Sequence, residues 1–342
     1  MIATLKKFFA KLISLPVSLL DEKPKWDAPP PKNPEQLDWA SAIPFAFLNF
    51  SVLFVFLVGF SPIALILAIV FYFLRMFAIT GFYHRYFSHK TFKMNRFWQA
   101  FFAILGVTAV QKGPIWWAAH HREHHLYSDK EGDMHSPVQG GFWDAHILWI
   151  LRQKSFSFNK DRVKDLMKFP ELVFISRFHR VIVILFFVLL YFLGVGLNFF
   201  FPSLNTSGAQ ILVWVGLVST VFNYHCTYAI NSLTHMMGRR RYKTTDNSRN
   251  SFLISLFTMG EGWHNNHHYC PTTVRQGFHW WQIDFSYYGL KLLEKMHIVK
   301  DLRMPPAHVY SEKNPDLIKS AVQKPEPEST TIKKPVTDSA SN

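Results

Sequence analysis

The sequence predicts an all-α membrane protein in which four transmembrane helices carry a helical cap on the cytoplasmic side. Two observations predict the spans: residues 41–74 and residues 181–230 contain no Asp, Glu, Lys or Arg. A third predicts the cap, because histidine clusters lie just outside these apolar runs, in polar and charged stretches. With 34 Phe, 11 Trp and 49% hydrophobic residues, the composition is typical of a membrane protein rather than of a soluble domain.

The first 40 residues should form a cytoplasmic N-terminal segment. Residues 1–20 mix lysines with apolar side chains and offer no small-residue cleavage site, which favours an amphipathic interfacial helix over a signal peptide. Residues 21–38 are rich in proline and charge and should be an extended linker. We therefore expect three regions, namely 1–40, an integral-membrane domain over 41–305, and a disordered tail over 306–342.

Turn residues divide the two apolar runs into four spans of about 20 residues, each long enough to cross about 30 Å of hydrocarbon. Ser61-Pro62 separates a helix over about 41–60 from one over about 62–82, and FPSLNTSG separates 181–201 from 209–230. Arg75 lies inside the second span and should face protein or reach toward the interface, because a lipid-facing charge is costly. Residues 97–110 are apolar but too short to span, so we expect an interfacial helix there.

The distribution of charge predicts the orientation. The loops around Ser61-Pro62 and around 202–208 are uncharged, whereas every Lys and every Arg except Arg75 lies elsewhere. By the positive-inside rule, both termini and all histidine clusters face the cytoplasm. The net charge of +14 is spread over segments that flank the apolar runs, so we expect contact with membrane lipids and an anionic substrate, and no nucleic acid. Cys226 and Cys270 are too few for a disulfide framework and should be packing residues.

Four short motifs predict a metal site. They are HRYFSH (His84, His89), HREHH (His121, His124, His125), NSLTH (Asn231, His235) and HNNHH (His264, His267, His268). Residues three and four apart share a helix face, so the last three motifs can each point at a common centre. Neutral imidazole is a common ligand of iron, copper and zinc, and nine rings are too many for one ion, which predicts two.

The spacing inside HRYFSH needs a separate explanation. His84 and His89 are five apart, about 140° around an ideal α-helix, so we expect the helix to break between Arg85 and Ser88. Other histidines near the clusters lack metal spacing and should be structural, and nearby tryptophans should lie at the headgroup level. The histidines are His120, His135, His146 and His225, and the tryptophans are Trp116, Trp117, Trp143 and Trp149.

Four stretches, GFYHRYFSHKTF, GPIWWAAHHREHHLYSD, NSLTHMMG and GEGWHNNHH, resemble in order and spacing the motifs of membrane fatty-acid desaturases of the acyl-CoA delta-9 (stearoyl-CoA) desaturase family. GPIWW and GEGWHNNHH are more similar to bacterial and cyanobacterial members than to the animal enzymes. The resemblance covers roughly residues 40–300. The combination of HxxxxH, HxxHH, NxxxH and HxxHH is highly specific, although each motif alone would be weak.

The resemblance implies a di-iron centre that takes two electrons, activates O2 and introduces a cis double bond into a saturated fatty-acyl chain. It implies that the metal ligands are His84, His89, His121, His124, His125, His235, His264, His267 and His268, with Asn231 bound through a water. Metal-bound histidines usually donate their second ring N–H to a carboxylate. Glu123, Asp129, Asp133 and Glu261 are the nearby candidates.

The substrate site must select one methylene pair in a chain that offers no hydrogen bonds. A narrow, bent apolar tunnel of fixed depth could measure that position, and we expect the first, second and fourth helices to line it. Arg152 and Lys154 resemble in position the basic patch that grips the coenzyme A phosphates in animal relatives. Both acyl-CoA and acyl-lipid substrates stay open. RRRYK (239–243) should attract lipid headgroups or contact the substrate.

The sequence contains no HPGG, CxxC or GxGxxG motif, so we expect a separate electron donor, which could be a cytochrome b5-like protein, a ferredoxin or a rubredoxin. Two alternatives to a desaturase stay open. One is a di-iron fatty-acyl hydroxylase, which adds oxygen instead of removing hydrogen. The other is a histidine-rich membrane metal transporter, which would place its ligands at mid-bilayer. The favoured interpretation is a delta-9 desaturase of a bacterial cytoplasmic membrane.

Overall fold

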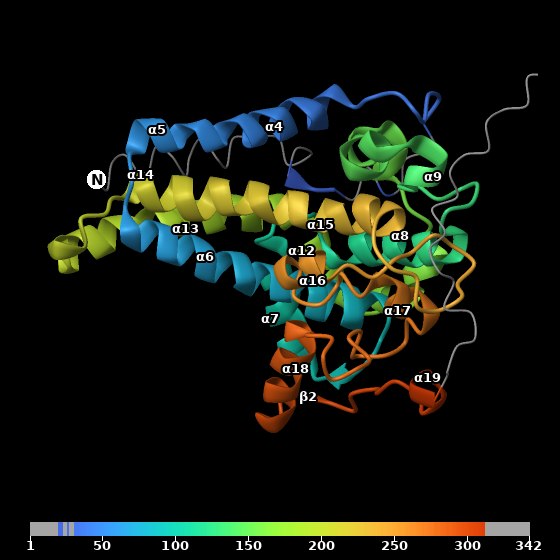
Figure 1. The fold of residues 1–342 in the computed structure, drawn as a ribbon. Coiled ribbons are helices and arrows are strands. Elements are labelled where there is room, and N and C mark those ends of the chain that lie inside the picture. The colour runs from blue at the N-terminus through green and yellow to red at the C-terminus, as the bar shows by residue number, and fades with distance from the viewer. Residues whose placement is uncertain (1–19, 23–25, 27–30, 312–342) are drawn as a thin grey trace, which may run out of the picture.

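The computed structural model describes residues 20–22, 26 and 31–311. Four helical segments are long and apolar enough to cross a membrane, namely Trp39–Val58, Pro62–Ser88, His179–Phe200 and Gly208–Met236. Figure 1 shows these segments running alongside one another, with most of the shorter helices gathered at one end as a cap. The prediction of an all-α membrane protein with four spans is confirmed. Residues 1–19 of the expected N-terminal helix and residues 312–342 of the expected tail lie outside the described part.

Each span except the third is a composite of helix types. The first span consists of α4 (Trp39–Phe50), η1 (Ser51–Phe54) and α5 (Val55–Val58), and the second of α6 (Pro62–Phe77) and η2 (Ala78–Ser88). The third is α13 (His179–Phe200), and the fourth consists of α14 (Gly208–Ile211), η7 (Leu212–Val218) and α15 (Ser219–Met236). The second and fourth run past their predicted ends near 82 and 230, because a helix satisfies its backbone internally and can continue beyond the hydrocarbon with polar residues.

The cap is built from short elements. Those between the second and third spans are β1 (Lys93–Met94), α7 (Arg96–Val107), α8 (Pro114–Tyr127), α9 (Pro137–Gly140), η3 (Asp144–Leu148), α10 (Trp149–Leu151), η4 (Gln153–Phe156), η5 (Lys160–Val163), α11 (Lys164–Met167) and α12 (Pro170–Arg177). Those after the fourth span are α16 (Phe252–Phe257), α17 (His264–Tyr269), α18 (Phe285–Lys295), β2 (Val299–Lys300) and α19 (His308–Ser311), while η6 (Pro202–Leu204) lies between the last two spans. β1 pairs antiparallel with β2 and forms the one sheet of the described residues.

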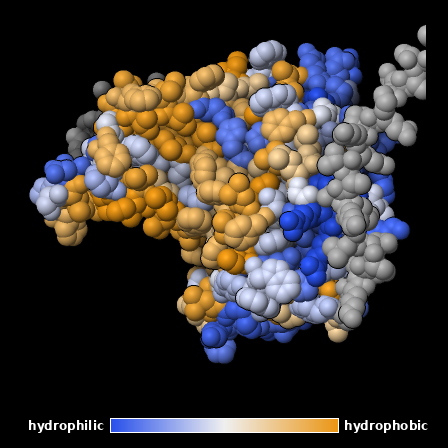
Figure 2. Space-filling model, viewed as in Figure 1, coloured by the Kyte–Doolittle hydropathy of each residue, from blue (hydrophilic) through white to orange (hydrophobic). Residues whose placement is uncertain are grey.

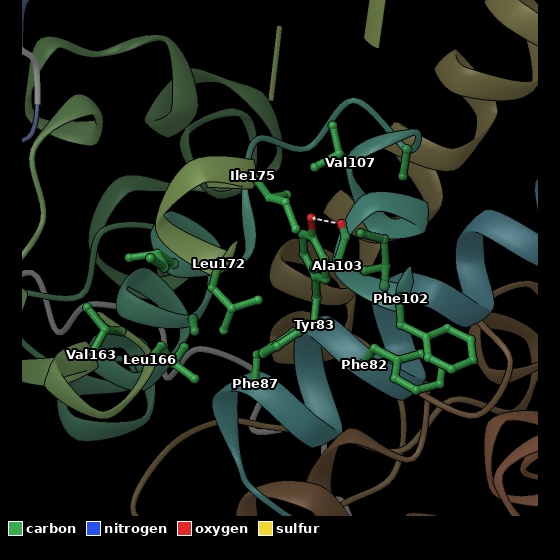
Figure 3. Packing of buried hydrophobic residues seen from close by; sticks show 14 of the residues in the cluster. Phe82, Tyr83, Phe87, Phe102, Ala103, Val107, Val163, Leu166, Leu172 and Ile175 are labelled. Atoms are coloured by element: carbon green, nitrogen blue, oxygen red, sulfur yellow. Dashed lines mark hydrogen bonds between the residues drawn. The ribbon is translucent and has the colours of Figure 1, made fainter. Parts of the chain in front are cut away.

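An apolar core fixes the cap to the second span (Figure 3). Phe82 stacks on Phe102 of α7 with ring centroids 3.5 Å apart, and the Tyr83 hydroxyl donates to the Ala103 carbonyl oxygen at 3.0 Å. Gly106 is required at this contact, because a Cβ there would lie 2.1 Å from the Tyr83 ring. The expected interfacial helix over 97–110 is therefore α7, held against the cap end of the second span with the Phe97 side chain exposed.

Arg75 of the second span faces protein, which decides between the two positions that the sequence left open. Its side chain is fully buried, and all five of its N–H groups donate to oxygen. The acceptors are the carbonyl oxygens of Phe71, Thr108 and Val215 and the hydroxyls of Thr220 and Ser219. The apolar surface of the spans is thus uninterrupted by this charge, and Figure 2 shows the apolar side chains over the spans and the hydrophilic ones mainly over the cap.

Candidate metal centre

Five of the nine predicted histidines converge in one group. Their ring nitrogens lie within 4.8 Å of one another, and the group consists of His84, His89, His121, His125 and His267. The Nε2 atoms of His84 and His267 are 3.0 Å apart, those of His89 and His121 are 2.7 Å apart, and those of His125 and His267 are 2.8 Å apart. Three elements supply these rings, because the end of the second span, α8 and α17 meet here.

The other four histidines form a second group beside the first. His124, His235, His264 and His268 also have ring nitrogens within 4.8 Å of one another. The Nε2 atoms of His235 and His264 are 3.0 Å apart. His125 of the first group stacks on His268 of the second, with ring centroids 4.5 Å apart, so the two groups are adjacent. All nine histidines that the sequence singled out are therefore brought together, in one group of five and one group of four.

The expected helix break between Arg85 and Ser88 is wrong. The chain winds as a π-helix from Ala78 to Ser88, and the His89 N–H donates to the His84 carbonyl oxygen at 3.2 Å, a five-residue step. Because a π-helix closes its turns between residues five apart, His84 and His89 follow each other along one side without a break. Their rings lie 4.9 Å apart. Sequence spacing alone assumed α-helical winding and so predicted a break.

Four carboxylates bind the outer nitrogens of the histidines. Nδ1 of His84 lies 2.5 Å from Glu261, and Nδ1 of His124 lies 3.0 Å from Asp133. Nδ1 of His235 lies 2.8 Å from Asp129, and Nδ1 of His268 lies 2.8 Å from Asp246. Three of the four proposed carboxylates thus accept from ring nitrogens, whereas Glu123 makes no such bond within the described residues. Asp246 was missed because it lies 22 residues from its histidine, with no spacing to mark it.

These carboxylates determine which nitrogen of each contacted ring carries the proton. A carboxylate on Nδ1 requires a proton there, so the neutral ring presents the Nε2 lone pair to the centre of the group. Burial lowers the pKa of His121, His125 and His267 well below the usual value, which keeps these rings neutral at neutral pH. Burial alone would raise the pKa of Asp246, but the hydrogen bond and charge of His268 lower it below its usual range.

The donor set fits transition-metal ions. Several Nε2 atoms lie 2.7–3.0 Å apart, and a cation between them would satisfy all of the lone pairs at once. The four carboxylates lie behind the rings, on the side away from the shared centre. This all-nitrogen arrangement suits iron, copper or zinc and disfavours calcium or magnesium, which prefer oxygen.

A buried ion network supports Glu261 in turn. The Arg85 guanidinium donates to Glu261 at 3.0 Å and lies 2.9 Å from Asp284. All three side chains are almost fully buried. Asp284 also accepts from the backbone N–H of Gln276 at 2.7 Å. Arg85, which lies next to His84 in HRYFSH, therefore positions the carboxylate that orients His84.

A cavity of about 680 Å³ reaches the metal centre. Its walls come from α4, α13, α15 and the segment 110–117, and both His121 and Asn231 line it. Trp117 also lines it and stacks on His121, with centroids 5.0 Å apart. We expected the first, second and fourth helices to line the tunnel, and this is wrong for the second helix. The first, third and fourth spans line the cavity, whereas the second span packs around Arg75.

Two of the tryptophans expected at the headgroup level are buried. Trp116 and Trp149 stack at 5.9 Å and line the cavity, and the Trp116 indole N–H donates to the Ser155 carbonyl oxygen. Only Trp143 of the four is largely exposed. The sequence could not separate these cases, because an amphipathic ring suits both an interface and a polar cavity wall.

The predicted head-group residues lie in ion pairs. Arg152 and Lys154 both bind Glu35 of the linker, and Arg152 also contacts Asp144 at 2.5 Å. The described end of the linker runs along this segment, since the Gln153 N–H donates to the Gln36 carbonyl oxygen. Contact of these cations with substrate stays a prediction.

The histidines expected to be structural make hydrogen bonds or ring contacts of their own. Nδ1 of His120 donates to the Trp116 carbonyl oxygen, and His146 contacts Ser232 and His225. The His135 ring is tilted by 35° against the His124 ring with centroids 4.2 Å apart, and His124, Asp133 and His135 form a third group that could hold a metal ion.

The fold and the site together define a class of protein, a helical membrane protein with four candidate spans and two adjacent histidine groups, each of which could hold a metal ion. The particular family follows from comparison: residues 36–295 match the family model for fatty acid desaturases, and the chain belongs to that family. It is 36% identical over 276 residues to Delta-9 acyl-lipid desaturase 1 of Arabidopsis thaliana, covering 79% of this chain and 85% of the relative.

The names of two other relatives differ from each other in the position of the double bond and in the substrate. The chain is 37% identical over 233 residues to the Acyl-CoA C20 Delta5-desaturase of Anemone leveillei, covering 67% of this chain and 70% of the relative. It is 32% identical over 272 residues to the sn-1 stearoyl-lipid 9-desaturase of Anabaena variabilis, covering 79% and 95%. Membership of this family thus supports the conclusion that the protein is an oxidoreductase that acts on fatty-acyl chains.

Proposed function

We propose that this protein is an O2-dependent desaturase that introduces a cis double bond at the delta-9 position of a saturated fatty-acyl chain. In the balanced reaction, one –CH2–CH2– unit, O2, two electrons and two protons give –CH=CH– and two molecules of water. The electrons come from a separate donor protein.

The observation that best supports this proposal is that His121 belongs both to a histidine group and to the cavity wall. It is a member of the group of five histidines and a wall residue of the cavity. A chain bound in this cavity would pass beside the metal centre, whereas a metal transporter would place its ligands at mid-bilayer. In this protein the two groups lie in the cap and in the cap ends of the second and fourth spans.

We propose that His84, His89, His121, His125 and His267 hold one iron ion, and that His124, His235, His264 and His268 hold the second, with Asn231 acting through a water. Two bound iron ions would supply the redox chemistry that activates O2 for removal of two hydrogens. The four carboxylates on Nδ1 would fix the tautomer of their rings and aim Nε2 at the ions. The buried setting would exclude bulk water from the reaction.

The cavity would select the methylene pair by depth. Gln111 donates to the side chains of Asn223 and Thr227 at 2.9 Å, and the Trp117 indole N–H donates to Gln111, so polar contacts fix the wall beside His121. With this wall rigid, the bond position depends on how far the chain extends into the apolar part between α4 and α13. The motifs favour the delta-9 position. Because the relatives include enzymes named as delta-9 and as delta-5 desaturases, the position of the double bond has to be tested.

The substrate carrier, donor and orientation are part of the proposal. We infer an acyl-lipid or acyl-CoA substrate, an electron donor of the cytochrome b5-like, ferredoxin or rubredoxin type, and a metal centre on the cytoplasmic side by the positive-inside rule. A bacterial cytoplasmic membrane stays a prediction, since the relatives come from plants and a cyanobacterium.

Expression in a host whose lipids contain only saturated chains tests the reaction. We expect products two hydrogens lighter than the saturated chain, with the double bond mapped to carbon 9, and we expect His124→Ala to abolish them. Products that gain one oxygen would support the hydroxylase instead. Desaturation by His124→Ala at the parent level would contradict the ligand assignment.

A further inference from the structure

One side of the cap helix α18 is apolar and exposed. Phe285, Tyr288, Leu292 and Met296 follow one another at steps of three or four residues and so share one face. Between 42% and 60% of each side chain's surface is exposed. The helix packs on the cap through a different face, which buries Ser286 and Leu290. We call the four exposed residues the α18 stripe.

The packed face of α18 fixes its level along the spans. The hydroxyls of Ser286 and Thr80 are 2.6 Å apart, and a Cβ on Gly289 would lie 2.7 Å from the Phe77 ring. Phe77 and Thr80 belong to the second span and lie about one and two turns beyond Phe73, whose side chain is exposed on the outer surface of that span. The stripe therefore adjoins surface that lipid must cover.

The direction of α18 agrees with this level. Figure 1 shows α18 running across the direction of α6, as a helix lying along a membrane surface would, and Figure 2 shows apolar side chains at this edge of the cap. Trp280 and Trp281, which precede α18, are also exposed, and indole rings concentrate at the membrane interface. Lys291 and Lys295 lie on the adjoining face of the helix, where cations suit phosphate headgroups.

We infer that α18 is an interfacial helix whose stripe is inserted into the lipid leaflet on which the cap rests. Lipid is the favoured occupant because the stripe continues the lipid-covered surface of the second span and is bordered by lysines. α7, which also packs against the second span, exposes Phe97 and Phe101 in a similar way. The cap would then contact the membrane through two helices. This inference concerns position only and does not depend on the proposed reaction.

Site-specific fluorescence quenching in the full-length protein tests the inference. Leu292→Cys, in a background with Cys226→Ala and Cys270→Ser, would carry a bimane label in phosphatidylcholine nanodiscs that hold one protein each. Lys291→Cys is the matched control, because it is the neighbouring residue on the polar face and its exposed pair with Glu294 contributes little to stability. Met296→Cys, on the same stripe, provides a second probe should Leu292→Cys fold poorly.

We expect lipids with a nitroxide near the headgroup to reduce emission at 292 and 296 at least about twofold more than at 291, as for an apolar face buried about 5–10 Å into the boundary. Aqueous iodide should show the reverse order. Strong iodide quenching at 292 and 296 without lipid quenching would overturn the inference, because the stripe would lie in water. Protection from both quenchers would also overturn it, because protein would then cover the stripe.

Discussion

Asp246 accepts a hydrogen bond from Nδ1 of His268 at 2.8 Å and so connects the loop after the fourth span to the group of four histidines. The same loop places the Asn247 N–H on Asp129, which binds His235. Two carboxylates of this group are thus held by one short segment, and the segment matters to the metal centre although it contains no predicted ligand.

Replacement of Asp246 should weaken metal retention. In Asp246→Ala the His268 ring loses the partner that fixes its tautomer and orientation, and such losses typically reduce metal affinity about 10–100-fold. Chelator competition followed by elemental analysis measures the effect. Asp161→Ala is the control, because Asp161 is exposed and pairs only with Lys164 within the described residues. Equal retention in both variants would show that Asp246 does not orient His268.

Removal of the Arg85 charge should destabilise the cap strongly. Arg85→Gln would leave Glu261 and Asp284 buried without their cation, and breaking a buried pair in this way costs about 3–5 kcal/mol. We expect a lower thermal midpoint in detergent and a lower metal content, since Glu261 orients His84. Arg96→Gln, which breaks an exposed pair with Glu171, should change stability by less than about 1 kcal/mol. A normal midpoint in Arg85→Gln would contradict the positioning role.

A methyl group at Gly106 should disturb the contact between α7 and the second span. Gly106→Ala places a Cβ against the Tyr83 ring, and such overpacking typically costs about 1–3 kcal/mol. Gly196→Ala in α13 is a matched control, because nothing lies within 4 Å of its Cβ position. Thermal unfolding followed by helix circular dichroism compares them, and equal midpoints would argue against close packing at Gly106.

Filling the α4 side of the cavity should change the preferred chain length. Leu48 lines the cavity from α4, so Leu48→Trp removes volume and should shift the products toward shorter acyl chains. Leu53→Trp on the same span points outward, where its side chain is exposed, and should leave the product profile unchanged. Lipid analysis by gas chromatography gives both profiles. An unaltered profile in Leu48→Trp would show that the cavity does not determine the chain length of the products.

Much of the fold and of the candidate site could be predicted from short stretches of the sequence. Uncharged runs predicted the four spans because hydrocarbon excludes charge, and the short motifs singled out the nine histidines that the structure brings together. The division into two groups was not predicted, because HREHH and HNNHH each contribute rings to both groups. The π-winding between His84 and His89 could not be predicted, since it depends on packing around Tyr83 and Ser88. Asp246 and the part of α13 in the cavity wall could not be predicted either, because they depend on contacts between segments far apart in the chain.

We propose that the nine histidines hold two iron ions in each polypeptide. Elemental analysis of protein purified from iron-replete cells, with Mössbauer spectroscopy on iron-57-labelled samples, tests it most directly. We expect about two iron ions per chain in nitrogen-rich sites, and about one or fewer in His124→Ala. A well-folded sample that retains no more than one ion per chain, or that holds zinc in place of iron, would contradict it.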